Sequence, residues 1–218
     1  MKIGFFNTYE PTGHYDQTVH LVLADLMIRS VRKTMPGVEI VQLTDYISPA
    51  IMGIDRVSRR PKKPNAVLCV EHYASCEGDW LFLDTDVIVQ QDVRHVFDQD
   101  FDVAVCDRDG TFVDTEEETP MMQDMPHNIG VVFSRSSLFW DAVLEKLLTM
   151  EETRQHWMGN QYAACQVIAD RTFHVEHLPG VMYNYAAHDT ADRCETAAIA
   201  HYKGPFRKKM MLSRFHEV

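Results

Sequence analysis

Short apolar runs alternate along the chain with longer segments in which apolar residues recur every three or four positions. Short runs rich in β-branched and aromatic residues are typical of buried strands. They predict strands at residues 3–6, 38–43, 80–89, 101–106 and 129–134. Since these runs alternate with helical segments, the pattern indicates an α/β sheet.

Four intervening segments have the period of amphipathic helices. They are expected at residues 16–35, 65–76, from Ser136 or Ser137 to about 150, and 160–169, with Asn65 and Asn160 as caps. The inward faces are predicted to comprise Val19, Val22, Leu23, Leu26, Met27 and Val31 in the first helix, and Trp140, Val143, Leu144, Leu147 and Leu148 in the third. About the last 45 residues are less regular and predict a loop or tail. With no repeat or linker, one domain over 1–218 is expected.

Asp84 and Asp86 interrupt the apolar run 80–89. On an extended backbone, residues two apart project from the same side, so the two carboxylates would converge. Their repulsion and lost hydration are ordinarily relieved by a hard divalent cation with oxygen ligands. An Asp-Thr-Asp turn that only ends a strand is the alternative.

The formal net charge of -11 argues against broad nucleic-acid binding, which favours basic surfaces. Cations gather at residues 55–63 and at Arg207–Lys209 with Arg214, and these two stretches either build one anion site or form separate solvated patches. The acidic segment 107–124 has little apolar periodicity and is expected to be a mobile loop that closes over a ligand.

The chain has no apolar run of the ~20 residues that span a bilayer. Its first residues predict a strand and lack the apolar core of a signal peptide. Five scattered cysteines without a CxxC pair form neither a disulfide framework nor a zinc motif. Together these features favour a cytoplasmic protein.

Polar residues follow the first two predicted strands. Asn7 and Thr8 follow the first strand and Asp45 follows the second, so they are expected at the sheet edge that holds Asp84. Their groups suit a nucleobase and a ribose, although Asn, Thr and Asp also favour strand ends as turn residues.

The segment that begins at His201 contains a candidate nitrogen ligand, a glycine and cations. His201 is a ligand type that Mn²⁺ accepts, Gly204 allows close backbone approach to phosphate, and Lys203 or Arg207 adds positive charge. A histidine in the core or on the surface is the ordinary alternative.

Four elements in this order resemble glycosyltransferases of the GT-A fold, and most of all the retaining family that contains glycogenin and bacterial lipopolysaccharide galactosyltransferases. They are Asp84-Thr85-Asp86, Asn128-Ile129-Gly130, Asn160-Gln161 and His201-Tyr202-Lys203-Gly204 with Arg207. The resemblance covers nearly the whole chain. It implies a Rossmann-like, mixed but mostly parallel sheet flanked by helices, with a nucleotide-sugar-binding half at 1–106, a flexible loop at 107–127 and a sugar and acceptor half at 128–218.

The resemblance also implies a nucleotide-sugar donor, with UDP as the expected nucleotide. Asp84, Asp86 and His201 would hold Mn²⁺, or Mg²⁺, on the diphosphate. The other donor contacts would involve Thr85, Lys203, Gly204 and Arg207 near the diphosphate, and Arg60 or Lys63 from the basic stretch. The resemblance implies that the catalytic residues are Asn128 and Asn160 near the sugar and Gln161, at the place where relatives have an amide or carboxylate beneath the anomeric carbon. Retention of anomeric configuration rests on the resemblance alone.

Two departures from the family pattern stand out. Asn160 replaces an aspartate, which suggests a different donor sugar or only a helix cap. Lys208-Lys209 replaces the Pro-Trp that usually follows the C-terminal lysine. A nucleotide-sugar-binding module without turnover and a sugar-phosphate nucleotidyltransferase are the competing hypotheses, and the latter lacks its Gly-rich phosphate loop. The acceptor stays open among a saccharide, a lipid-linked glycan, a protein side chain and a modified nucleobase.

Overall fold

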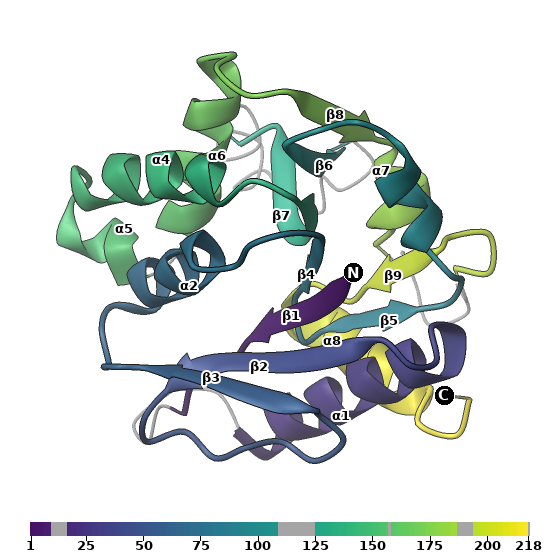
Figure 1. Ribbon diagram of the computed structural model, residues 1–218. Coiled ribbons are helices and arrows are strands. Elements are labelled where there is room, and N and C mark those ends of the chain that lie inside the picture. The colour runs from purple at the N-terminus through teal and green to yellow at the C-terminus, as the bar shows by residue number, and fades with distance from the viewer. Residues whose placement is uncertain (10–16, 109–124, 157, 187–193, 218) are drawn as a thin grey trace.

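A computed structural model describes residues 1–9, 17–108, 125–156, 158–186 and 194–217 (Figure 1). Most of the predicted acidic loop therefore lies outside the described residues. Within the described part, every helix is too short or too polar to cross a lipid bilayer.

The described strands form one large, mostly parallel sheet. Its order is β3 (Arg56–Arg60), β2 (Glu39–Asp45), β1 (Lys2–Phe6), β4 (Trp80–Leu83), β7 (His127–Ser134), β6 (Val103–Asp107) and β8 (Val175–Leu178). Only β7 runs antiparallel to its neighbours among these strands. This confirms the predicted α/β class.

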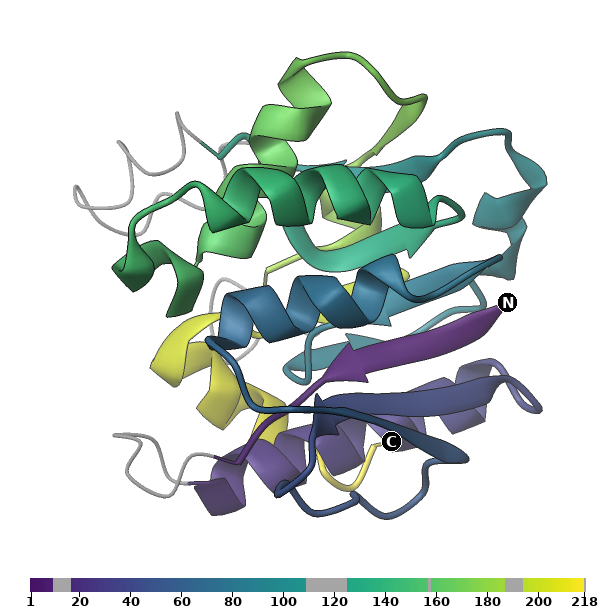
Figure 2. The same cartoon turned by 60° about the vertical axis from the view of Figure 1, so that its left-hand side comes forward.

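The two faces of the sheet bury different cores because successive side chains of a strand point to opposite sides. In β4, Trp80 and Phe82 pack on one side, and Leu81 and Leu83 pack on the other. The first side is covered by α2 (Asn65–Ala74), α4 (Ser137–Leu148) and α6 (Gly159–Ala169), with α5 (Glu152–His156) beside them (Figure 2). The other side carries α1 (Gln17–Thr34), α8 (Gly204–Ser213), and the antiparallel pair β5 (Val87–Val89) and β9 (Ile199–His201). Two short elements, η1 (Arg94–Asp98) and α7 (Gly180–Tyr183), complete the described structure.

The predicted single strand 80–89 is wrong, because a turn at Thr85 and Asp86 divides it into β4 and β5. The Asp84 N–H still donates to the carbonyl of Gly130 at the end of the large sheet (2.8 Å). Beyond the turn the chain changes partner, and the Tyr202 N–H donates to the carbonyl of Asp86 (2.8 Å). The turn, rather than an extended backbone, therefore brings the two carboxylates together.

The irregular tail predicted for the last residues is also wrong, since β8, β9 and α8 lie there. β8 and β9 are only four and three residues long, too short to display a period. α8 buries Met210 and Met211 but is otherwise rich in cations, so its sequence lacks an apolar stripe. The basic stretch likewise contains β3, whose residues are not buried.

Helix caps were predicted with mixed success. Ser136 caps α4, since its Oγ accepts from the Phe139 N–H (3.3 Å). The predicted caps of α2 and α6 are wrong: the cap positions belong to Pro64 and Met158, and neither makes a side-chain capping bond. Met158 adopts φ 61°, and this backbone reversal starts α6 without an Asn side chain. The predicted inward faces hold in α1 and in most of α4, where Leu144 is half-buried but Leu148 is 54% exposed.

Candidate functional site

The carboxyl ends of the parallel strands meet at one edge of the sheet, where such folds bind ligands. β1 leads into Asn7 and Thr8, and β2 ends at Asp45. β4 leads into Asp84, and the antiparallel β7 brings its first residues, including Asn128, to the same edge. A cleft of about 280 Å³ opens there. Its lining comprises Phe6, Asn65, Ala66, Cys69, Tyr73, Asp84, Ile129, Gly130, His156, Met158, Asn160 and Gln161.

Asp84, Asp86 and His201 form a compact cluster beside this cleft, with one potential ligand atom from each lying within 4.8 Å of the others. His201 Nε2 lies 3.1 Å from Asp86 Oδ1 and 3.5 Å from Asp84 Oδ2. The cluster forms because β9 pairs with β5 and sets His201 opposite Val87 (Figure 1). His201 is only 2% exposed, and the pairing of β9 with β5 holds this segment against the Asp-Thr-Asp turn.

Gly130 of β7 gives the cluster the space that it needs. A Cβ atom at this position would overlap His201 Cε1 and Asp84 Oδ2, and would lie 3.0 Å from Asn128 Oδ1. Real Cβ atoms do not approach other atoms so closely, and all three neighbours belong to the site. Close packing around the cluster therefore explains the glycine of the Asn128-Ile129-Gly130 motif.

A chain of amide groups orients His201. The Gly130 N–H can only donate, so the Asn128 atom that it reaches at 3.1 Å is the oxygen. This oxygen also accepts from Asn184 Nδ2 (2.8 Å), which leaves Asn184 Oδ1 to face His201 Nδ1 (2.7 Å). An amide oxygen can only accept, so Nδ1 carries a proton. In the neutral ring the lone pair of Nε2 then points at the two carboxylates, which is the arrangement that a metal ion requires.

The same chain continues to Gln161 on α6. Asn128 Nδ2 donates to Gln161 Oε1 (3.0 Å), and the Ile129 N–H approaches that oxygen at 3.4 Å. Gln161 Nε2 faces the sulfur of Met125 (3.4 Å). Buried hydrogen bonds therefore connect His201 through Asn184 and Asn128 to a side chain in the cleft wall.

Lys208 of α8 adds a positive charge to the cluster, with its Nζ 3.2 Å from Asp86 Oδ2. Burial alone would raise the pKa of Asp86, but the charge and hydrogen bond of the imidazolium form of His201, together with those of Lys208, hold that pKa well below its usual range. Asp86 is thus ionised at neutral pH, and an ammonium group supplies part of the countercharge. Two carboxylate oxygens and one imidazole nitrogen form a donor set suited to Mn²⁺ or Mg²⁺, so the residues present fit such an ion.

The turn from β9 into α8 contains further predicted residues, and among them Lys203 is close enough to interact electrostatically with Asp84 and Asp86. Gly204 adopts φ 76°, a backbone conformation that favours glycine. Lys203 is half-buried, and burial together with the nearby charge of Arg108 lowers its pKa to about 8. Arg207 is half-buried on the first turns of α8.

Several other predicted residues make local contacts. Thr8 Oγ1 donates to Asn65 Oδ1 (3.2 Å), and the carbonyl of Asn7 accepts from the Thr44 hydroxyl (2.5 Å). Asp45 Oδ1 accepts from the Ser48 N–H (2.7 Å), as expected of a turn residue. The other oxygen of Asp45, Oδ2, is buried without a hydrogen-bond partner among the described residues.

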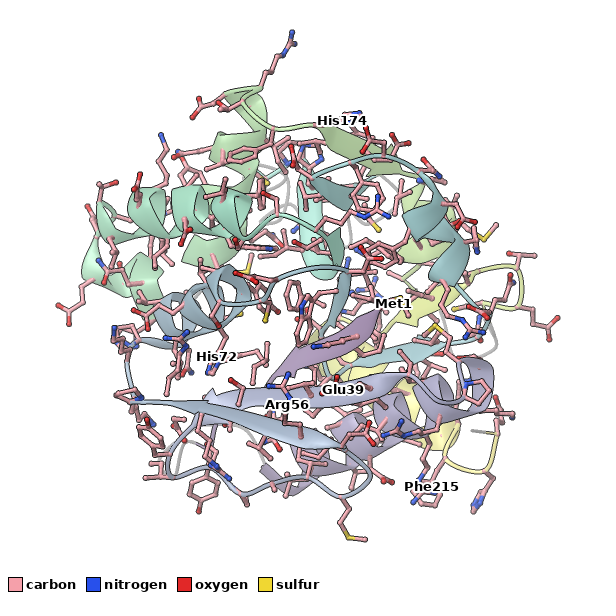
Figure 3. All side chains as sticks on the ribbon, in the orientation of Figure 1. Met1, Glu39, Arg56, His72, His174 and Phe215 are labelled. Carbon is pink, nitrogen blue, oxygen red and sulfur yellow. The ribbon has the colours of Figure 1, made fainter. Side chains whose placement is uncertain are left out.

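The basic stretch is largely paired within its own region. Arg56 reaches Glu39 on the neighbouring strand (3.1 Å, Figure 3), and Lys63 pairs with Glu71 of α2. β3 lies three strands from β4, a distance of about 14 Å. Arg60 and Lys63 do not line the cleft. The alternative of two separate basic patches therefore describes this geometry better than one shared anion site.

Sequence reasoning missed Asn184, Lys208 and Met125 as neighbours of the site. Lys208 was noticed only as a departure from the family pattern, although a lysine one turn along a helix that follows a candidate ligand is a usable indication. Asn184 and Met125 carry no motif of their own. Asn160, whose family counterpart is an aspartate, lies in the cleft wall with its Nδ2 4.0 Å from the Cys69 sulfur.

No family model matches the chain, and no curated protein sequence matches it. Solved structures do match it. The galactosyltransferase LgtC, solved in complex with donor and acceptor sugar analogs, superposes with a TM-score of 0.61 at 14% identity, over 100% of this chain and 96% of its own. A glycosyltransferase involved in the glycosylation of the major capsid of PBCV-1 gives 0.59 at 14% identity over 100% of both chains. GlyE of Streptococcus pneumoniae TIGR4 gives 0.55 at 17% identity, over 83% of this chain and 45% of GlyE. The chain has the GT-A fold that the sequence resemblance implies.

Proposed function

We propose that this chain is a metal-dependent glycosyltransferase that transfers a hexose from a UDP-sugar to an acceptor. The observation that carries the proposal is the cluster of Asp84, Asp86 and His201 beside a cleft of about 280 Å³. The fold it shares with LgtC, whose structure holds donor and acceptor sugar analogs, supports the same reading and favours a saccharide acceptor.

In this proposal Asp84, Asp86 and His201 hold Mn²⁺ or Mg²⁺ against the donor diphosphate. A bound ion would neutralise the charge that develops on the departing nucleoside diphosphate. An ion on Asp86 would replace the ammonium of Lys208 and leave it available to the phosphate oxygens. Lys203 and Arg207 add cations from the same segment, while Thr85 and Gly204 offer backbone groups.

The sugar would occupy the part of the cleft lined by Asn160 and Gln161, with Asn128 held behind them by hydrogen bonds. Retention of configuration, which the family resemblance implies, belongs to the same proposal. At the nucleoside end, the groups proposed to contact base and ribose are Asn7, Thr8 and Asp45. Arg60 or Lys63 is the proposed basic contact to the donor. The proposed setting is the cytoplasm, with which the five buried free thiols are compatible.

The test measures UDP binding by calorimetry and UDP release from UDP-sugars, each with Mn²⁺ and with excess chelator. We expect Mn²⁺ and UDP to bind together much more tightly than either alone. Asp86→Asn should lower donor hydrolysis by about 100-fold or more, because an ion at the leaving group contributes several kcal/mol. Asp92→Asn is the control, since Asp92 is an exposed residue paired with Arg94 just beyond β5.

Equal UDP affinity with and without chelator would contradict the metal-diphosphate arrangement. Metal-dependent binding of UDP-sugars without hydrolysis or transfer would instead identify a binding module without turnover, the alternative that Asn160 keeps open.

A further inference from the structure

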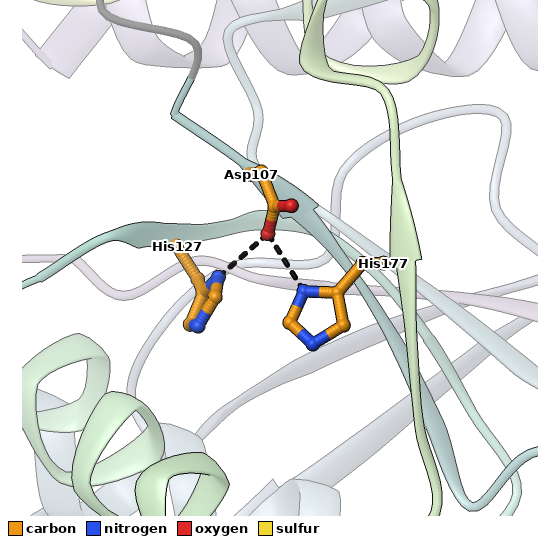
Figure 4. A group of neighbouring side chains, drawn as sticks. All are labelled: Asp107, His127 and His177. Carbon is orange, nitrogen blue, oxygen red and sulfur yellow. Dashed lines mark hydrogen bonds and ion pairs between the residues drawn. The ribbon is translucent and has the colours of Figure 1, made fainter.

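A second cluster of histidine and carboxylate side chains lies at the same sheet edge, outside the site described above. Asp107 is the last residue of β6, His127 is the first residue of β7, and His177 lies on β8 (Figure 4). Asp107 Oδ1 lies 2.8 Å from the Nδ1 atoms of both His127 and His177. The rings of the two histidines have centroids 5.1 Å apart.

Strand register explains why these three side chains meet. Asp107 pairs with His127 across the β6–β7 ladder, and His177 pairs with Val105 on the other side of β6. Paired residues point to the same face of a sheet, as do residues two apart on one strand. All three side chains therefore project from one face and converge on the carboxylate of the central strand.

We propose that Asp107, His127 and His177 form a second metal site, for a divalent transition-metal ion such as Zn²⁺. Two imidazole nitrogens and a carboxylate oxygen are a ligand set typical of zinc, with the remaining position open to water. At metal–ligand bond lengths of about 2.0–2.1 Å, tetrahedral ligand atoms lie about 3.3 Å apart. The distances of 2.8 Å from Asp107 Oδ1 to the two Nδ1 atoms thus need to lengthen by only about half an ångström.

The protonation states suit such a site. A carboxylate oxygen accepts hydrogen bonds, so the Nδ1 atoms of both rings donate to Asp107. Binding an ion at Nδ1 moves each proton to Nε2 through solvent, so the ion replaces two hydrogen bonds with no net release of protons.

The surroundings favour moderate affinity and easy access. His177 has 47% of its side chain exposed, as has Asp107, while His127 is 12% exposed. Arg108 follows Asp107, and its Nε approaches the carbonyl oxygen of His127 (3.4 Å). The positive charge of Arg108 repels a metal ion, and the negative charge of the Asp107 carboxylate offsets this repulsion.

The second cluster is separate from the first one. β7 lies between β4 and β6, so the strands that carry Asp84 and Asp107 are about 10 Å apart. The first cluster has two carboxylates and one imidazole, whereas the second has one carboxylate and two imidazoles. The nitrogen-rich set should therefore prefer Zn²⁺ or Co²⁺, and the oxygen-rich set Mn²⁺ or Mg²⁺.

The experiment counts bound Zn²⁺ by calorimetry on the whole chain after metal is removed with chelator, with Co²⁺ absorption as a second measure. The wild-type chain should bind two equivalents, because Zn²⁺ also fits the first cluster. His177→Ala should bind one, Asp86→Asn should bind one, and the double variant should bind none. His174→Ala is the matched control, since His174 lies three residues earlier, just before β8 (Figure 3), and should leave both equivalents.

His177 is exposed, so its truncation should leave the fold intact, which circular dichroism in chelator checks. His127→Gln should weaken the same equivalent by at least about 100-fold, since even groups that only support a ligand are worth 10–100-fold. Two equivalents in His177→Ala, or a single wild-type equivalent that Asp86→Asn removes, would overturn the second site. If Asp86→Asn still bound two equivalents while His177→Ala bound one, the result would count against the proposed function and leave the second site standing.

Discussion

The two clusters of histidine and carboxylate side chains share their ligand types but differ in how they are supported. His201 is 2% exposed, and Asn184 holds its second ring nitrogen. His177 is about half exposed, and no described residue holds its Nε2 atom. A buried ligand with a fixed tautomer is preorganised for an ion, while an exposed ligand pair can rearrange. This difference predicts that substitutions around the first cluster strongly weaken its metal binding, whereas the second cluster tolerates substitutions around it.

The substitution with the largest expected effect on this comparison is Gly130→Ala. The added Cβ would overlap His201 and Asp84, so metal-dependent UDP binding should fall by at least about 100-fold. Overpacking of a buried site should also cost about 1–3 kcal/mol in the free energy of unfolding. Zn²⁺ binding at Asp107, His127 and His177 should persist, as measured by Co²⁺ absorption.

The control for this loss is Val131→Ala, which removes packing from the next residue of β7 without entering the cluster. It should lower the melting temperature and retain Mn²⁺-dependent UDP binding. If Gly130→Ala kept wild-type UDP affinity, the cluster would be adaptable as well, and the contrast between the two sites would disappear.

A smaller effect is expected from Asn184→Ala, which removes the group that orients His201. Groups that hold the far nitrogen of a ligating histidine contribute about 10–100-fold to metal affinity, so Mn²⁺ binding should weaken by that factor. Asn184→Asp still accepts from Nδ1 and should restore part of the affinity. Unchanged affinity in Asn184→Ala, measured by calorimetry, would show that burial alone positions the ring.

The smallest effect is expected from Lys208→Ala, and its sign depends on the ligand. The ammonium of Lys208 occupies Asp86, so its removal should raise the affinity for Mn²⁺ alone by a factor of about five, the equivalent of about 1 kcal/mol. The same variant should lower UDP affinity in saturating Mn²⁺, because a phosphate-binding cation is lost. Lys209→Ala, an exposed neighbour, is the control. A change of the same sign in both measurements would show that Lys208 is not exchanged between Asp86 and phosphate.

The sequence predicted the core strands and the residues at their carboxyl ends because strands buried on both faces form short continuous apolar runs. The run that carries Asp84 and Asp86 was found in this way, and motif order pointed to His201. The split of that run into β4 and β5 could not be predicted, because both halves are apolar. The partner of β5 lies more than 100 positions further along the chain.

The parts that sequence reasoning missed depend on tertiary contacts rather than on local preference. Met158, the residue before α6, has a left-handed backbone conformation that the local sequence does not predict. Asn184 was missed because an isolated asparagine in an irregular segment resembles any turn residue. Its role follows from the hydrogen bonds that it makes to residues 56 positions before it and 17 after it.

The pairing of β5 with β9 also imposes an order on folding. Asp86 and His201 lie 115 positions apart. Their contact therefore closes a long loop, and closing a long loop early in folding costs conformational entropy. During synthesis the strands β1 to β4 emerge before β9, because they precede it along the chain. A chain that has folded only as far as β5 therefore holds Asp84 and Asp86 without His201, which joins them when β9 docks. The cluster of Asp84, Asp86 and His201 is therefore completed only in the late step in which β9 docks on β5.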